Sequence, residues 1–179
     1  MQPVETAHVT VTVNGQVVQE QVPVRLTLAD FLRERLGLTG THLGCEQGVC
    51  GACSILLDGV AVRSCLLLAV QTDGHTVTTI EGLLPDTGLE RTLTPLMRAM
   101  QAHHGLQCGF CTPGVIITLT AFLQQQPHAT AAEIREALAA NLCRCTGYQG
   151  MVEAALSIVR QTASLATTVT QKARQEVAG

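Results

Sequence analysis

Residues 141–150 read NLCRCTGYQG, which places Cys143 and Cys145 one residue apart where a predicted helix ends. A disulfide between such close neighbours would be strained, and two free thiols so near each other would invite oxidation. We therefore expect both cysteines to share partners from elsewhere in the chain. The rest of the sequence has to supply those partners and show what the set binds.

The segments around this stretch follow a helical period. Thr130 and Glu133 form a capping box that opens a helix. Its Ile134, Leu138 and Leu142 fall at four-residue spacing, so they share one face. The next helix begins near Gly147, because apolar residues recur after it at i, i+3, i+4 and i+7.

Two more helices are predicted upstream. Thr94-Pro95 is an N-cap followed by proline, and Thr112-Pro113 repeats that signal before GVIITLTAFL. This run is apolar nearly all round, so we expect it to form the central, buried helix. Four helices with short joins predict a small four-helix bundle.

The first half of the chain alternates apolar and polar residues instead, which is typical of strands. Asn14-Gly15 and Asp58-Gly59 are hairpin turn signals, and Thr27 opens a short helix. We expect strands over 8–13, 16–22, 54–57, 60–64 and 76–80. The fold class is therefore α+β, with a sheet domain over 1–82, a helical domain over 83–162, a linker over 81–93 and a tail over 163–179.

Four cysteines of the first half form one set. Cys45, Cys50 and Cys53 have the CxxxxCxxC spacing of plant-type [2Fe–2S] proteins, and Cys65 follows a hairpin. The glycines between them let the backbone approach a cluster and aim amides at its sulfurs.

The second set contains the partners expected for Cys143 and Cys145. Cys108 and Cys111 form a CxxC pair just before the helix that starts at Thr112. If that helix packs antiparallel to the helix that ends before Cys143 and Cys145, all four sulfurs meet at one end of the bundle. Tetrahedral zinc would accept either set of four, and CGFC at a helix start also resembles a redox-active dithiol.

Composition excludes several classes. Apolar residues make up 46% of the 179 residues, but three Phe, one Tyr and no Trp leave little for stacking on bases. The net charge of -3 and the lack of basic runs argue against nucleic-acid binding. The sequence has no uninterrupted run of 18 apolar residues, so it does not predict a membrane-spanning helix. The N-terminus lacks the features of an export signal, so we expect a cytoplasmic chain with reduced thiols. Cysteines are then more readily explained as ligands or redox groups than as disulfides.

A plant-type motif followed by QCGFCTPG and NLCRCTGY resembles the iron–sulfur subunit of the molybdenum hydroxylases, the xanthine oxidase family. The resemblance covers about residues 8–160. It implies a ferredoxin-like β-grasp domain and a four-helix domain, each with one [2Fe–2S] cluster. The implied ligands are Cys45, Cys50, Cys53 and Cys65 for the first cluster, and Cys108, Cys111, Cys143 and Cys145 for the second.

The resemblance also implies a role and partners. Gln107 and Cys145 would contact the molybdopterin, in its cytosine dinucleotide form, of a large subunit. Electrons from an aldehyde, N-heteroaromatic, purine or CO would pass through both clusters to FAD on a medium subunit, or to a haem-containing acceptor in its place. No complete active site would lie on this chain, which is an electron-transfer subunit of an oxidoreductase. The alternatives are a free-standing two-cluster ferredoxin and a zinc-stabilised interaction module.

Overall fold

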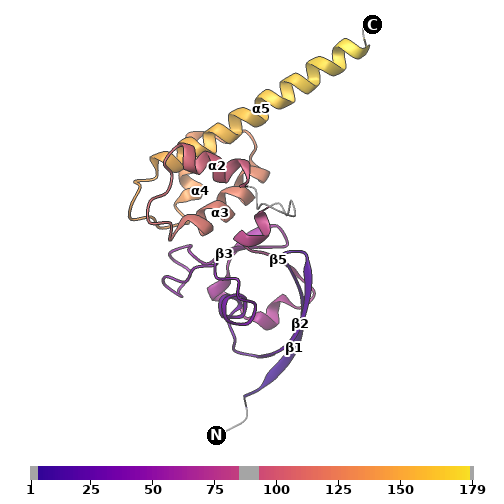
Figure 1. Cartoon of the computed structure of the whole chain (residues 1–179), viewed down its shortest axis with the longest axis vertical. Coiled ribbons are helices and arrows are strands. Elements are labelled where there is room, and N and C mark those ends of the chain that lie inside the picture. The colour runs from indigo at the N-terminus through magenta and orange to yellow at the C-terminus, as the bar shows by residue number, and fades with distance from the viewer. Residues whose placement is uncertain (1–3, 85–92, 178–179) are drawn as a thin grey trace.

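The structure is a computed structural model that describes residues 4–84 and 93–177, with side chains as far as residue 164. A sheet domain is followed by a helical domain, and the last helix projects away from both (Figure 1). This order confirms the expected α+β class. The linker expected over 81–93 lies mostly outside the described residues.

The sheet has the strand order β2-β1-β5-β3-β4. β1 pairs antiparallel with β2 and parallel with β5, and β3 pairs antiparallel with both β4 and β5. The strands are β1 Thr6–Val13, β2 Gln16–Pro23, β3 Ser54–Leu57, β4 Val60–Arg63 and β5 Thr76–Thr78. All five predicted strands are present, although β5 stops earlier than expected because Ile80 opens a short 3₁₀ helix.

Both predicted hairpin turns are confirmed by their backbone angles. Asn14 and Gly15 have φ values of 51° and 82°, and Asp58 and Gly59 have 48° and 83°. Positive φ at both central residues is what a two-residue turn needs to match the twist of its strands.

A short helical segment packs on this sheet within the first domain. α1 (Leu28–Asp30) continues into a π-helical turn over Phe31–Arg35, and the Thr27 hydroxyl accepts the Asp30 amide at 3.1 Å. Phe31 and Leu32 are fully buried against the valines of β1. Three 3₁₀ helices complete the domain, over Ser64–Leu66, Ala69–Thr72 and Ile80–Leu83.

The helical domain contains α2 (Pro95–Ala102), α3 (Thr112–Gln125), α4 (Ala131–Leu138) and α5 (Gln149–Val177). α3 is the buried centre, as expected from its apolar run. The capping box of α4 is confirmed, since the Thr130 amide donates to Glu133 Oε2 at 2.7 Å and Thr130 Oγ1 accepts the Glu133 amide at 3.4 Å. α5 continues through the residues that we expected to form a separate tail. No helix in the described part of the chain is long and apolar enough to cross a membrane.

Two local predictions were wrong. Thr112 is not the N-cap of α3: Cys111 takes that position, because the Val115 amide already bonds to the Cys111 carbonyl at 3.0 Å. Leu142 does not continue the stripe of α4, which ends at Leu138, and its side chain is 57% exposed. The Leu142 amide bonds instead to the Cys50 carbonyl of the sheet domain at 2.8 Å.

Candidate metal centres

The four cysteines of the first set lie on the loop that precedes β3 and on the 3₁₀ turn that follows β4. The amides of Gln47 and Cys50 both point at Cys45 Sγ, each at 3.4 Å. These amides and the Cys50 thiol lower the pKa of Cys45 to about 6. Amides directed at sulfur stabilise a thiolate, which is the form that binds metal.

Within this set the thiols influence one another. Cys50 acts on Cys45, and Cys53 acts on Cys65 together with a weaker effect of Cys45. Burial and the hydrogen bond to Cys53 raise the pKa of Cys65 to about 11. Cys53 is buried, whereas the other three cysteines of this set are partly exposed.

The second set is assembled from two segments. Cys108 and Cys111 precede α3, and Cys143 and Cys145 lie between α4 and α5. Cys108 contacts Cys145, and Cys111 contacts Cys143, so the structure brings all four predicted cysteines together. The expected meeting of the start of one helix with the end of another is confirmed.

Electrostatics differ across this second set. The Phe110 amide lowers the pKa of the Cys108 thiol, while burial raises the pKa of Cys111 to about 12. Burial opposes ionisation of Cys143 as well, but hydrogen bonds from Thr146 outweigh it and lower its pKa. The pKa is therefore lowered at Cys108 and Cys143 and raised at Cys111.

Thr146 and Tyr148 support Cys143 in a way that the cysteine spacing did not reveal. Thr146 Oγ1 lies 3.2 Å from Cys143 Sγ. The Tyr148 hydroxyl accepts the Cys143 amide at 2.8 Å and donates to the Asn141 carbonyl at 3.1 Å. The sequence signal for both residues was their place directly after the CxC pair.

The chemistry of these donors fits a cluster with two irons. The thiols of each set lie close enough to shift one another's pKa values. A [2Fe–2S] cluster takes four thiolates, two for each iron, so a set of four neighbouring thiols suits it.

Exposure separates the two ends of the second set. Cys108 and Cys145 are exposed, whereas Cys111 is buried at the start of α3. Gln107 is exposed directly before Cys108. A partner can therefore reach the pair formed by Cys108 and Cys145 together with Gln107.

Phe110, in the CGFC loop of the helical domain, contacts the sheet domain. Its ring stacks on His42 with centroids 5.0 Å apart, and its carbonyl lies 2.7 Å from His42 Nδ1. His42 is thus a contact between two loops. The same ring approaches Gly44, where an added Cβ would lie 3.4 Å from Phe110 and 3.2 Å from Cys50 Sγ.

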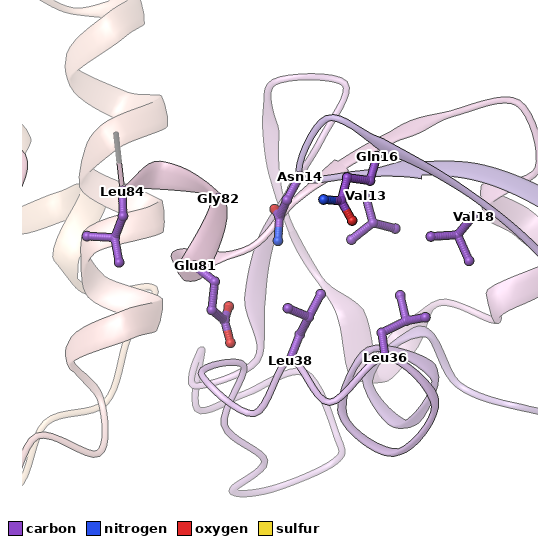
Figure 2. A pocket seen from close by; sticks show the side chains of 9 residues that line it. All are labelled: Val13, Asn14, Gln16, Val18, Leu36, Leu38, Glu81, Gly82 and Leu84. Atoms are coloured by element: carbon purple, nitrogen blue, oxygen red, sulfur yellow. The ribbon is translucent and has the colours of Figure 1, made fainter. Parts of the chain in front are cut away.

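An open cleft of about 610 Å³ lies elsewhere, between the first hairpin and the residues that follow α1 (Figure 2). Leu36 and Leu38 line it, together with Glu81. The Glu81 carboxylate already accepts the Gly40 amide at 2.8 Å and the Thr79 hydroxyl at 2.5 Å. No cysteine lines this cleft, so it belongs to neither sulfur set.

Two family models match the chain. The 2Fe-2S iron-sulfur cluster binding domain matches residues 11–77, and the [2Fe-2S] binding domain matches residues 79–156. The two matches coincide with the sheet domain and the helical domain, and each contains one of the two sulfur sets.

Curated relatives cover most of the chain. The caffeine dehydrogenase subunit gamma of Pseudomonas sp. (strain CBB1) is 51% identical, over 84% of this chain and 89% of that protein. The nicotine 6-hydroxylase small subunit of Paenarthrobacter nicotinovorans is also 51% identical, over 86% and 90%. Among solved structures, quinoline 2-oxidoreductase from Pseudomonas putida 86 superposes with a TM-score of 0.82 at 44% identity, over 89% of this chain and 96% of that one.

Proposed function

This chain belongs to the iron–sulfur subunits of the molybdenum hydroxylases, the xanthine oxidase family, and from that premise we propose that it carries electrons from the molybdopterin site of a large subunit, through two [2Fe–2S] clusters, to a flavin subunit. The observation that carries the proposal is the pair of four-thiol sets, one in each matched domain. When bound, each cluster accepts one electron and passes it on.

The residues of this chain hold the clusters. Cys45, Cys50, Cys53 and Cys65 bind the first, and Cys108, Cys111, Cys143 and Cys145 bind the second. Three contacts support this assignment: the two amides directed at Cys45 Sγ and the Thr146 hydroxyl beside Cys143 Sγ. Hydrogen bonds of this kind also tune the reduction potentials of clusters.

Gln107 and Cys145 form the contact with molybdopterin. Both are exposed at the same end of the second set, so the cofactor of the large subunit can approach them. The molybdopterin is the cytosine dinucleotide form, and FAD lies on a medium subunit, with a haem-containing acceptor as its alternative. The finer description of the fold, a β-grasp domain over 1–82 and a four-helix bundle over 83–162, belongs to the same proposal.

The substrate of the complex is an N-heteroaromatic compound, with an aldehyde, purine or CO as alternatives. The names of three relatives support this order, since they refer to caffeine, nicotine and quinoline, which all contain nitrogen heterocycles. The complex works in the cytoplasm, where thiols stay reduced until a cluster is inserted.

The test is metal and sulfide analysis of the protein purified from its native host. We expect about four irons and about four acid-labile sulfides per chain, two of each for every cluster. Protein that contains zinc and no labile sulfide would overturn the proposal. Size-exclusion chromatography of the native extract tests the partners: elution at the mass of a complex supports a subunit, and elution at the monomer mass favours a free-standing ferredoxin.

A Gln107→Ala variant tests the molybdopterin contact separately. We expect both clusters to be retained and the transfer of electrons from the substrate to the second cluster, which lies beside Gln107, to slow. An unchanged rate of that first transfer would remove Gln107 from the contact and leave the rest of the proposal standing.

A further inference from the structure

The two sulfur sets are joined by a seam of backbone contacts, made by residues 50–54 of the sheet domain and 140–142 of the helical domain. The Leu142 amide donates to the Cys50 carbonyl at 2.8 Å, and Asn141 Nδ2 donates to the Gly51 carbonyl at 2.9 Å. Asn141 is fully buried. The contacts therefore tie a residue of the first set to the residue just before Cys143.

Glycines allow this close approach. A Cβ added at Gly51 would lie 2.4 Å from the Ala140 carbonyl oxygen, and one added at Gly114 would lie 2.3 Å from the Gly51 carbonyl oxygen. Real Cβ atoms do not approach backbone oxygens so closely. The seam is thus packed as tightly as backbone allows.

Arg63 closes the seam from β4. One end of its guanidinium donates to the Ser54 hydroxyl at 2.5 Å, and the other donates to the Ala140 carbonyl. The Ser54 hydroxyl in turn donates to the Gly51 carbonyl at 2.6 Å. A planar guanidinium suits this task because its fork reaches two acceptors at fixed geometry.

Among the described side chains, no carboxylate forms an ion pair with Arg63. The ion pairs found among the described side chains are His75 with Asp58 and Arg160 with Glu153. Both acceptors of Arg63 are neutral, a hydroxyl and a carbonyl. Its acceptor Ser54 directly follows Cys53 in the sequence, and one residue, Ser64, separates Arg63 from Cys65.

We propose that Arg63 is a positioning residue that locks the two cluster sites into one relative arrangement, and that its positive charge acts on the first cluster through its place between Ser54 and the strand end that leads to Cys65. The inference rests on the proposed function. It assigns to this chain a device that sets both the spacing of the sites and the ease with which the first of them is reduced.

The electrostatic consequence has a definite sign. Reduction adds negative charge to a site held by four thiolates, and a nearby cation favours the more negative state. Arg63 therefore raises the reduction potential of the first cluster. We expect the second cluster to feel the same charge less, because the acceptor Ser54 directly follows Cys53, whereas the acceptor Ala140 lies three residues before Cys143.

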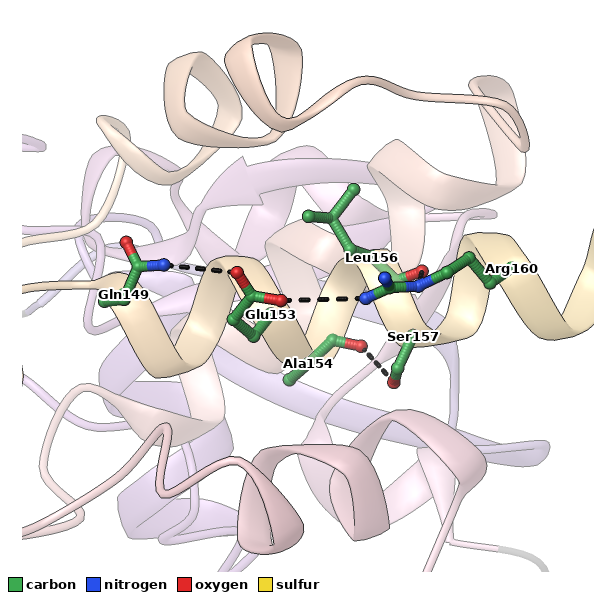
Figure 3. A network of polar contacts seen from close by, with 6 residues as sticks. All are labelled: Gln149, Glu153, Ala154, Leu156, Ser157 and Arg160. Atoms are coloured by element: carbon green, nitrogen blue, oxygen red, sulfur yellow. Dashed lines mark hydrogen bonds and ion pairs between the residues drawn. The ribbon is translucent and has the colours of Figure 1, made fainter.

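The experiment uses the complex as purified, with Arg63→Gln, Arg63→Lys and a matched control. The control is Arg160→Gln, which removes the same charge from an exposed residue of α5 whose partners are Glu153 at 3.6 Å and the Leu156 carbonyl at 3.2 Å (Figure 3). Two quantities are measured in each protein: the midpoint potential of each cluster by EPR-monitored titration, and the hydrogen exchange of the Leu142 amide.

Arg63→Gln is expected to lower the potential of the first cluster, to shift the second less, and to speed exchange at Leu142. Arg63→Lys keeps the charge but loses the fork, so it should keep the potential and still speed the exchange. If Arg63→Gln fails to load its clusters, the lysine variant decides the locking role by itself. Potentials and exchange like those of the wild type in loaded Arg63 variants would overturn the inference, whereas clusters missing from the wild type would overturn the proposed function instead.

Discussion

The two sulfur sets each consist of four thiols, but they are built in different ways. The first takes three cysteines from one glycine-rich loop, whose own amides point at Cys45 Sγ. The second joins cysteines from either side of α3 and α4, and it exists only because those helices pack together. Two sites with the same kind of ligand therefore depend on different features: the first on the conformation of one loop, and the second on the packing of the helical domain.

The largest effect is expected from removing one ligand of each set. Cys50→Ser should abolish the EPR signal of the first cluster alone, and Cys143→Ser that of the second alone, because the sites share no cysteine. Iron should fall from about four to about two per chain in each variant. Loss of both signals from a single change, in protein that keeps its circular dichroism, would contradict two separate sites.

The next largest effect is expected from weakening the helix packing on which the second set depends. Leu138 is 1% exposed at the end of α4. Leu138→Ala should lower the free energy of unfolding by about 2–5 kcal/mol, and a chelator should then remove the second cluster before the first. Leu138→Met keeps the volume and should cost less than about 1.5 kcal/mol. Equal loss of both clusters to the chelator would argue against a packing-dependent second site.

A smaller effect concerns the seam between the sets. Gly114→Ala should destabilise the chain by about 1–3 kcal/mol through crowding against the Gly51 carbonyl, although alanine is the better helix former. It should also speed hydrogen exchange at the Leu142 amide. Gly109→Ala is the contrast, since that residue has φ of +84° and no atom within 4 Å of an added Cβ. It should cost stability through backbone strain but leave Leu142 exchange unchanged; faster exchange in both variants would mean that the seam is not the cause.

The smallest effect is expected at the far end of α4. Thr130→Ala removes the cap hydroxyl that accepts the Glu133 amide, at a cost of about 1 kcal/mol in urea unfolding. Thr130→Ser keeps the hydroxyl and should behave like the wild type. Both variants should retain both clusters, and loss of the second in Thr130→Ala would show that the set depends on the whole of α4.

Local signals predicted most of the elements, because their causes lie within a few residues. Turn dipeptides with positive φ defined both hairpins, and Thr94 and Thr130 capped the helices that they were expected to open. The two errors, at Thr112 and Leu142, lie at the joints between elements. At Leu142 a hydrogen bond to the other domain replaces the continuation of a helix, and nothing within α4 itself signals that partner.

The sequence by itself determined which cysteines form each set, since spacing and order are properties of the chain. Only the tertiary structure decided which thiols pair within a set, which of them stay exposed, and how Arg63 bridges the two domains. The physical reason is that these contacts join residues far apart along the chain, such as Arg63 and Ala140. Their meeting depends on how the two domains pack and not on any local preference.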